Sequence, residues 1–151
     1  MSTYPNASKK TRGGRGKGDL KMGLLSHGSP ERPCVLVVDD EDAVRRLIRK
    51  VLERAGYSVV EASNGLEALQ RYQDGVFKLV VTDLDMPGMR GEEFLQCLAN
   101  EECMPRFLII SGRLGEIPTE WPFLAKPFLP SELLQRVCAV CSAADPAARI
   151  P

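Results

Sequence analysis

The chain has 151 residues, of which 44% are hydrophobic and 26% are charged, so it is long enough to bury one core of ordinary size. Its net charge is zero, but residues 1–32 carry seven Lys or Arg against two acids, whereas residues 33–151 carry thirteen against eighteen. No apolar run is long enough for a membrane span or a secretory signal. These numbers exclude a membrane-embedded or secreted class and predict a cytoplasmic protein.

The first 32 residues are rich in Gly, Lys and Arg and have no apolar period, so we expect a disordered basic tail. This tail could contact a nucleic acid or another anionic surface, or it could be a solvated linker from an upstream domain, which its composition favours. Residues 142–151 are small and polar, and we expect a flexible C-terminal tail there.

Strand and helix patterns alternate from residue 33 to residue 141. The first strand, CVLVV (34–38), is a continuous apolar run, as expected for a strand covered on both faces. The helix after it has apolar residues at helical spacing from Val44 to Ala55, and Gly56 is placed to end it.

The later part of this region continues the alternation, and five strands that alternate with helices predict an α/β fold with a doubly wound parallel sheet. The remaining expected elements are the strand YSVVEA (57–62), a helix around Leu66, Leu69 and Tyr72 that is capped by Ser63 or Asn64, the strand KLVVT (78–82), a helix around Phe94, Leu95 and Leu98, the strands RFLII (106–110) and PFLA (122–125), and a capped final helix that begins at Ser131.

Polar side chains follow four of these strands at the point where each strand ends. They are Asp39 and Asp40, Asp83, Ser111 and Lys126. The carboxyl ends of parallel strands lie at one edge of a sheet, where open α/β folds bind ligands, so we expect these residues to form one site.

The residue types at this edge indicate phosphoryl chemistry. Three carboxylates repel one another unless a cation compensates, and Mg²⁺ prefers oxygen ligands and often binds a phosphoryl oxygen as well. Lys126 can pair with the acids or with a phosphoryl group, Ser111 adds a hydroxyl, and Gly112 leaves its N–H open to an anion. One carboxylate can then act as a nucleophile.

Each of these residues also has a simpler interpretation. Asp39 and Asp40 could be ordinary caps of the helix that follows them, because acids are favoured at helix N-termini. Asp83 and the pair Ser111-Gly112 could simply belong to turns. Lys126, which stands before a proline, has no such capping role.

Four segments of the chain resemble the receiver domain of two-component response regulators, over essentially residues 33–141. The resemblance implies a five-stranded, flavodoxin-like sheet in the order 2-1-3-4-5. The matching segments, in family order, are VLVVDDED (35–42), LVVTDLDMPGMRG (79–91), LIISG (108–112) and LAKPF (124–128).

The resemblance also implies roles for single residues. Asp83 resembles the phosphoacceptor, and Asp40 and Asp39 resemble the acid pair that binds Mg²⁺ (or Mn²⁺) directly and through water. Asp85 would give its backbone carbonyl to the metal, and its N–H, together with that of Gly112, would meet the phosphoryl oxygens.

The last two strands would supply the remaining roles that the resemblance implies. Ser111 resembles the switch hydroxyl, and Lys126 the lysine that contacts the phosphoryl group. Phe123 stands at the place of the switch aromatic but has no hydroxyl, and Pro127 would follow a cis peptide bond, which X–Pro bonds allow.

Two features depart from the family pattern. Arg90 stands where an Asp usually precedes the glycine, a position expected to face solvent. The segment between Ser111 and Lys126 contains Pro118 and is too short for a full helix, so the family's fourth helix, between the fourth and fifth strands, is expected to be shortened or absent. We therefore expect that the domain does not signal through the common dimerisation face.

The resemblance predicts phosphotransfer from a histidine kinase or histidine phosphotransfer protein, and a downstream protein target that the residues do not identify. No DNA-binding output domain is expected in the chain, and the domain itself is not expected to be an enzyme beyond its own phosphorylation and dephosphorylation. One alternative is a phosphohydrolase of the haloacid dehalogenase type, because Asp83-Leu84-Asp85 resembles its acid pair. The other is a receiver-like interaction module that works without phosphate.

Overall fold

The computed structural model describes residues 31–101, 104–113, 115, 117–118 and 120–143. The expected N-terminal tail over 1–32 and C-terminal tail over 142–151 lie almost entirely outside these residues. None of the described helices is both long enough and apolar enough to cross a bilayer.

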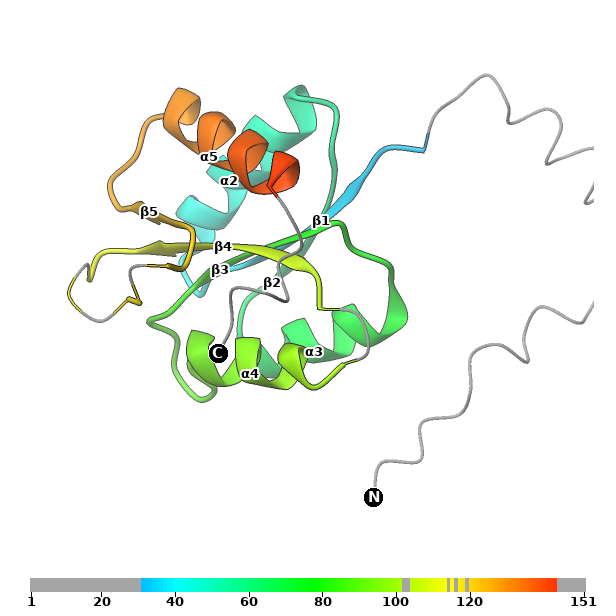
Figure 1. The fold of residues 1–151 in the computed structure, drawn as a ribbon, viewed down its shortest axis with the longest axis vertical. Helices are drawn as coiled ribbons and strands as arrows, with labels where there is room; N and C mark the ends of the chain where they lie inside the picture. The colour runs from blue at the N-terminus through cyan, green and yellow to red at the C-terminus, as the bar shows by residue number, and fades with distance from the viewer. Residues whose placement is uncertain (1–30, 102–103, 114, 116, 119, 144–151) are drawn as a thin grey trace, which may run out of the picture. The chain divides into compact units, whose positions relative to one another are not determined.

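Five parallel strands form one sheet in the order β2-β1-β3-β4-β5, which confirms the predicted architecture (Figure 1). The strands are β1 (Cys34–Val38), β2 (Ser58–Ala62), β3 (Leu79–Asp83), β4 (Arg106–Ser111) and β5 (Phe123–Ala125). The described helices, labelled as in Figure 1, are α2 (Asp42–Arg54), α3 (Gly65–Asp74), α4 (Gly91–Ala99) and α5 (Pro130–Ser142).

The helices cover both faces of the sheet, with α2 and α5 on one face and α3 and α4 on the other (Figure 1). Alternate residues of each strand point to opposite faces, so both sets must be apolar. In β1, Leu36 and Val38 pack toward α3 and α4, whereas Val35 and Val37 pack toward α2 and α5. This two-sided burial explains the continuous apolar run CVLVV.

The predicted helix ends agree with the structure at two places and differ at a third. Gly56 follows α2 with a φ of 97°, as a glycine after a helix often does, and Asn64 caps α3 by accepting the Glu67 N–H at 2.8 Å. The final helix begins at Pro130, one residue before the predicted Ser131. Proline suits this first position because its fixed φ is helical and its missing N–H would have no partner.

The connection between β4 and β5 contains no helical residue among its described positions, which confirms that the expected helix there is shortened or absent. The Trp121 N–H donates to the Pro118 carbonyl at 3.0 Å and closes a turn. Ile117 is buried, and the Trp121 ring meets the Phe107 ring edge to face at 5.6 Å between centroids. These two apolar side chains cover part of the sheet that a helix would otherwise cover.

Candidate functional site

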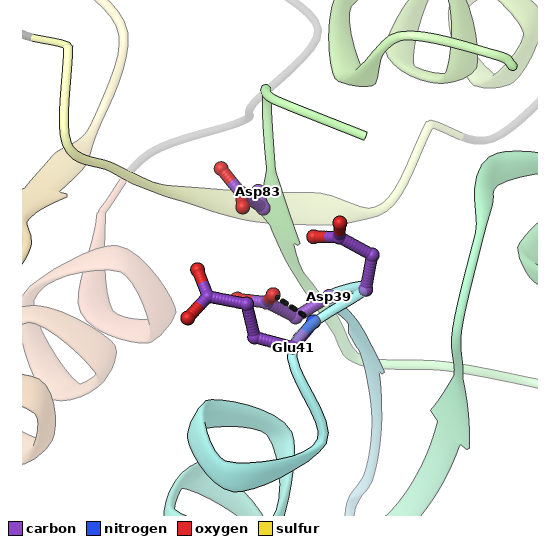
Figure 2. Close-up of side chains that lie close together, drawn as sticks. Asp39, Glu41 and Asp83 are labelled. Carbon is purple, nitrogen blue, oxygen red and sulfur yellow. Dashed lines mark hydrogen bonds between the residues drawn. The ribbon is translucent and has the colours of Figure 1, made fainter. Parts of the chain in front are cut away.

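Four carboxylates lie together at the carboxyl edge of the sheet. They come from the end of β1, the start of α2 and the end of β3, and one oxygen of each lies within 4.8 Å of the others: Asp39, Asp40, Glu41 and Asp83. Figure 2 shows the labelled side chains of Asp39, Glu41 and Asp83 gathered in one small region. Asp39 and Asp83 are buried, whereas Asp40 and Glu41 are exposed. We call this set the acid cluster.

The simpler interpretation of Asp39 and Asp40 as helix caps does not hold in the structure. The residue that precedes α2 is Glu41, and its side chain makes no capping hydrogen bond. Asp39 instead accepts the Glu41 N–H through Oδ1 at 2.9 Å, which fixes its carboxylate at the edge of the sheet (Figure 2).

The second carboxylate oxygen of Asp39, Oδ2, is buried without a hydrogen-bond partner. The Lys126 Nζ lies 2.9 Å away, but the pair is not well aligned for a hydrogen bond. Burial raises the pKa of Asp39 above its usual value, and the Glu41 N–H and the Lys126 charge oppose this effect only in part. A buried carboxylate with a free lone pair is a suitable ligand for a hard cation.

Lys126 is the cation that compensates the buried acids. Its Nζ lies 2.9 Å from both Asp39 Oδ2 and Asp83 Oδ2 and 3.3 Å from Glu41 Oε1. Burial lowers the pKa of Lys126, but its pairing with Asp39 and Asp83 outweighs burial and raises the pKa above the usual value. The ammonium is therefore charged at neutral pH.

The backbone at Lys126 pairs with β4 on one side and leads into a proline on the other. Its N–H donates to the Ser111 carbonyl at 2.9 Å, which continues the pairing of β4 with β5, and the Lys126–Pro127 peptide bond is cis. Ser111 itself is fully buried, and its Oγ accepts the Arg113 N–H at 3.1 Å. The hydroxyl thus lies at the same edge as the acids, followed by the exposed Gly112.

Asp83 is held by groups on both of its carboxylate oxygens. Oδ1 accepts the Asp85 N–H at 3.1 Å, and Oδ2 accepts a hydrogen bond from Lys126. The Asp85 carboxylate is partly exposed and pairs with Arg113 at 3.3 Å. A cavity of about 320 Å³ opens beside this pair, lined by Leu84, Asp85, Met86, Pro87, Arg90 and Arg113.

The structure thus brings Asp39, Asp40, Asp83 and Lys126 together, and places Ser111, Gly112 and Asp85 beside them. Phe123 lies in β5 opposite Ile109 and is half-buried against the cluster of apolar residues on the α3 and α4 face. Arg90, the departure from the family pattern, is exposed and lies 3.6 Å from the Glu92 carboxylate.

Three further residues at this edge were not predicted from the sequence. Glu41 joins the acid cluster and contacts Lys126, and its signal is the third acid in the run Asp-Asp-Glu-Asp. Arg45 donates to the Asp39 carbonyl, which no sequence pattern indicates. Gly91 packs against the backbone at the end of β3, where a Cβ would overlap the Asp83 carbonyl oxygen.

The oxygen donors present fit a divalent cation. Mg²⁺ binds through one or two carboxylates and keeps several waters, and the acid cluster offers two buried and two exposed carboxylates. The acid cluster, with a lysine and a hydroxyl beside it, contains the residue types that phosphoryl transfer uses.

Comparison with known proteins identifies the family of this chain. The family model described as "Response regulator receiver domain" matches residues 35–138. The transcriptional regulatory protein ResD of Bacillus subtilis is 35% identical over 113 residues, which cover 70% of this chain and 47% of ResD. The chain spans about half the length of the curated relatives it matches.

Solved structures give the same result at the level of the fold. The chemotaxis response regulator CheY4 of Vibrio cholerae is 30% identical with a TM-score of 0.66, and the match covers 73% of this chain and 99% of CheY4. The receiver domain of the hybrid histidine kinase CckA is 34% identical with a TM-score of 0.64, and the match covers 72% of this chain and 99% of that domain. The chain therefore belongs to the receiver domain family of response regulators.

Proposed function

We propose that this receiver domain accepts a phosphoryl group on Asp83 from a histidine kinase or a histidine phosphotransfer protein, in a reaction that needs Mg²⁺ or Mn²⁺. One observation carries the proposal: a single ammonium, that of Lys126, lies 2.9 Å from both Asp83 and Asp39. The candidate nucleophile and the candidate metal-binding acid therefore share one cation-stabilised site.

In the proposed reaction, a carboxylate oxygen of Asp83 attacks the phosphorus of a phosphohistidine. The P–N bond breaks, the new P–O bond makes an acyl phosphate, and the imidazole leaves with a proton from solvent. Water later attacks the same phosphorus, which releases inorganic phosphate and restores the carboxylate. Bound Mg²⁺ would neutralise the charge that builds up on the phosphoryl oxygens.

The chain's own groups position and stabilise the transferred phosphoryl group. Asp39, Asp40 and Asp83, with the Asp85 carbonyl, would hold the metal. The N–H groups of Asp85 and Gly112 would donate to phosphoryl oxygens, and Lys126 would exchange one carboxylate partner for a phosphoryl oxygen. The Asp85 N–H already donates to Asp83 Oδ1 at 3.1 Å, so it points toward the place where the new group forms.

The signal would follow from the added charge. A phosphoryl group adds about −1.5 to −2 charges at neutral pH, which Ser111 would meet from β4. Movement of the Ser111 hydroxyl would free space next to Phe123 in β5, and the surface around this half-buried ring would change. A protein that reads this surface is the proposed downstream target.

Residues 33–141 form the unit that is phosphorylated in this proposal. The protein would act in the cytoplasm, where kinases have access to ATP. The last helix, α5, ends at Ser142, which is one residue beyond the predicted end of this unit at residue 141.

Asp83→Asn tests the proposal directly. Wild-type protein incubated with acetyl phosphate and Mg²⁺ should gain one phosphoryl group by intact mass spectrometry, and Asp83→Asn should gain none, because its amide is not a nucleophile. Asp74→Asn, which changes an exposed acid in α3, is the matched control and should behave as wild type. Labelling of Asp83→Asn at the wild-type rate would contradict the assignment.

The same preparation separates the two alternatives. A haloacid dehalogenase-type phosphohydrolase would turn over a small phosphomonoester such as p-nitrophenyl phosphate, whereas a receiver should show essentially no turnover. A phosphate-independent module would bind no Mg²⁺ in a calorimetric titration and would take up no phosphoryl group.

A further inference from the structure

Arg45 lies in the second turn of α2 and contacts the end of β1 that carries the acid cluster. Its side chain is only 13% exposed, and each guanidinium nitrogen has a different partner. Nη1 donates to the Asp39 backbone carbonyl at 2.7 Å, Nε donates to Glu61 Oε1 at 3.3 Å, and Nη2 pairs with Asp42. Arg45 therefore connects the end of β1 to β2 and to the start of its own helix.

These contacts hold the backbone of Asp39 from both sides. The Asp39 N–H donates to the Ala62 carbonyl of β2 at 3.2 Å, and the Asp39 carbonyl accepts from Arg45. The carbonyl belongs to the peptide plane that leads into Asp40. Fixing this plane sets the directions in which the Asp39 and Asp40 side chains leave the chain.

We propose that Arg45 is a positioning residue for the divalent cation site, because it fixes the peptide between the two acids that would bind the metal. This inference rests on the proposed function, since it assumes that the acid cluster binds Mg²⁺. Metal ligands bind best when groups around them hold their orientation, and loss of such a group commonly weakens metal affinity by about tenfold or more.

Charge and geometry predict opposite effects for Arg45, which makes the inference testable. Arg45 carries a positive charge close to the acid cluster, so its removal alone should strengthen the attraction of a cation. If Arg45 acts by positioning, its removal should weaken cation binding in spite of the more negative site. Lysine keeps the charge but has no planar fork to hold three partners at once.

Arg49 provides a matched control on the same helix. It lies one turn further along α2, shares Glu61 with Arg45 through Oε2 at 2.8 Å, and pairs with Glu53 at 2.9 Å. Arg49→Gln removes the same charge from the same network without touching the Asp39 carbonyl contact.

The experiment is a calorimetric titration of Mg²⁺ into the full chain after removal of metal with EDTA. Arg45→Lys and Arg45→Gln should each bind Mg²⁺ about tenfold more weakly than wild type, and Arg49→Gln should bind equally or slightly more tightly. The Mg²⁺ concentration that gives half-maximal phosphorylation by acetyl phosphate should shift by the same factors, with the rate at saturating Mg²⁺ changed much less.

Circular dichroism in EDTA shows whether each variant is folded. If the Arg45 variants do not fold, Glu61→Gln loosens the Arg45 side chain from β2 and should weaken Mg²⁺ binding more than Glu53→Gln, which removes the same negative charge from a partner of Arg49. Wild-type affinity in Arg45→Lys, tighter binding in Arg45→Gln, or equal affinities in Glu61→Gln and Glu53→Gln would overturn the positioning role. Failure of the wild type to bind Mg²⁺ would instead overturn the proposed function.

Discussion

The carboxyl edge of the sheet and the connection between β4 and β5 are adjacent in the chain but are built differently. At the edge, charged groups from three strand ends meet within hydrogen-bond distance, with Lys126 between Asp39 and Asp83. The connection begins after Ser111 and returns at Phe123, and its described residues form turns without a helix.

The difference shows which parts of this fold depend on one another. Sheet register alone places Ser111 opposite Ala125 and therefore brings Lys126 to the acids, whatever path the chain takes in between. The connection needs only to span β4 and β5 and to cover apolar surface, which Ile117 and Trp121 do. The site can therefore keep its chemistry while the neighbouring surface changes.

The largest expected effect of a single methyl group is at Gly91, which lies at the edge. A Cβ at this position would overlap the Asp83 carbonyl oxygen and lie 2.7 Å from the Leu84 Cα, and backbone atoms cannot move aside easily. Gly91→Ala should lower the free energy of unfolding by about 3 kcal/mol and displace Asp83. Urea unfolding and acetyl phosphate labelling measure the two effects.

Gly115→Ala is the matched control in the connection, because a Cβ there would meet no atom within 4 Å. Its stability and phosphorylation should stay close to wild type. If both glycines tolerate alanine equally, the edge is less constrained than its contacts indicate. If Gly115→Ala is the more damaging change, the connection is more tightly constrained than the edge.

A smaller effect, of opposite sign, is expected at Asp39. Burial disfavours the charged form of this carboxylate and raises its pKa, so Asp39→Asn should raise the stability of the metal-free protein at pH 7, by less than Gly91→Ala lowers it. The same variant should lose the stabilisation that Mg²⁺ gives the wild type. Thermal unfolding in EDTA and in excess Mg²⁺ tests both statements.

The difference in stability between the wild type and Asp39→Asn should shrink as the pH falls. Because the folded pKa of Asp39 lies above the unfolded value near 3.8, the native state takes up a proton first as the pH falls. The wild type should therefore approach Asp39→Asn in stability as the pH falls through the folded pKa toward 3.8. A difference that does not change with pH, or a variant less stable than wild type at pH 7, would contradict the role of burial.

Most of the fold was predictable because its strands have an unambiguous pattern. CVLVV and FLII are continuous apolar runs, as expected for parallel strands covered on both faces, and the polar residues that follow them identify the edge. Helix starts were less predictable: Ser131 is a good cap residue, but Pro130 is an equally good first residue and precedes it.

Within the site, residues that follow a strand directly or belong to the family motifs were predictable, whereas Arg45 and Gly91, which contact the backbone of the acids from other elements, were not. Arg45 reaches the Asp39 carbonyl across a turn, a contact that depends on how α2 packs on β1 and β2. Gly91 is restricted by the Asp83 backbone, which lies eight positions earlier in the chain and approaches it only in the folded structure. Such contacts have no periodicity for a sequence pattern to show.

The smallest expected effect concerns the connection between β4 and β5, where we expect no change in oligomeric state. The common dimerisation face of the family includes the helix between the fourth and fifth strands, and the described residues of this connection have no helix to offer. A beryllofluoride complex, which imitates the phosphorylated state, should therefore leave the protein's mass in solution unchanged.

Size-exclusion chromatography with light scattering, with and without beryllofluoride and Mg²⁺, measures this mass. The Trp121 ring, half-buried beside β5, reports whether beryllofluoride has acted at all, because its fluorescence should respond to movement at Phe123. Asp83→Asn supplies the control that cannot hold the beryllofluoride as an acyl phosphate mimic. A beryllofluoride-dependent dimer that forms through residues 113–125 would show that the connection forms a signalling face without a helix. The inference that the edge and the connection vary independently would then be wrong.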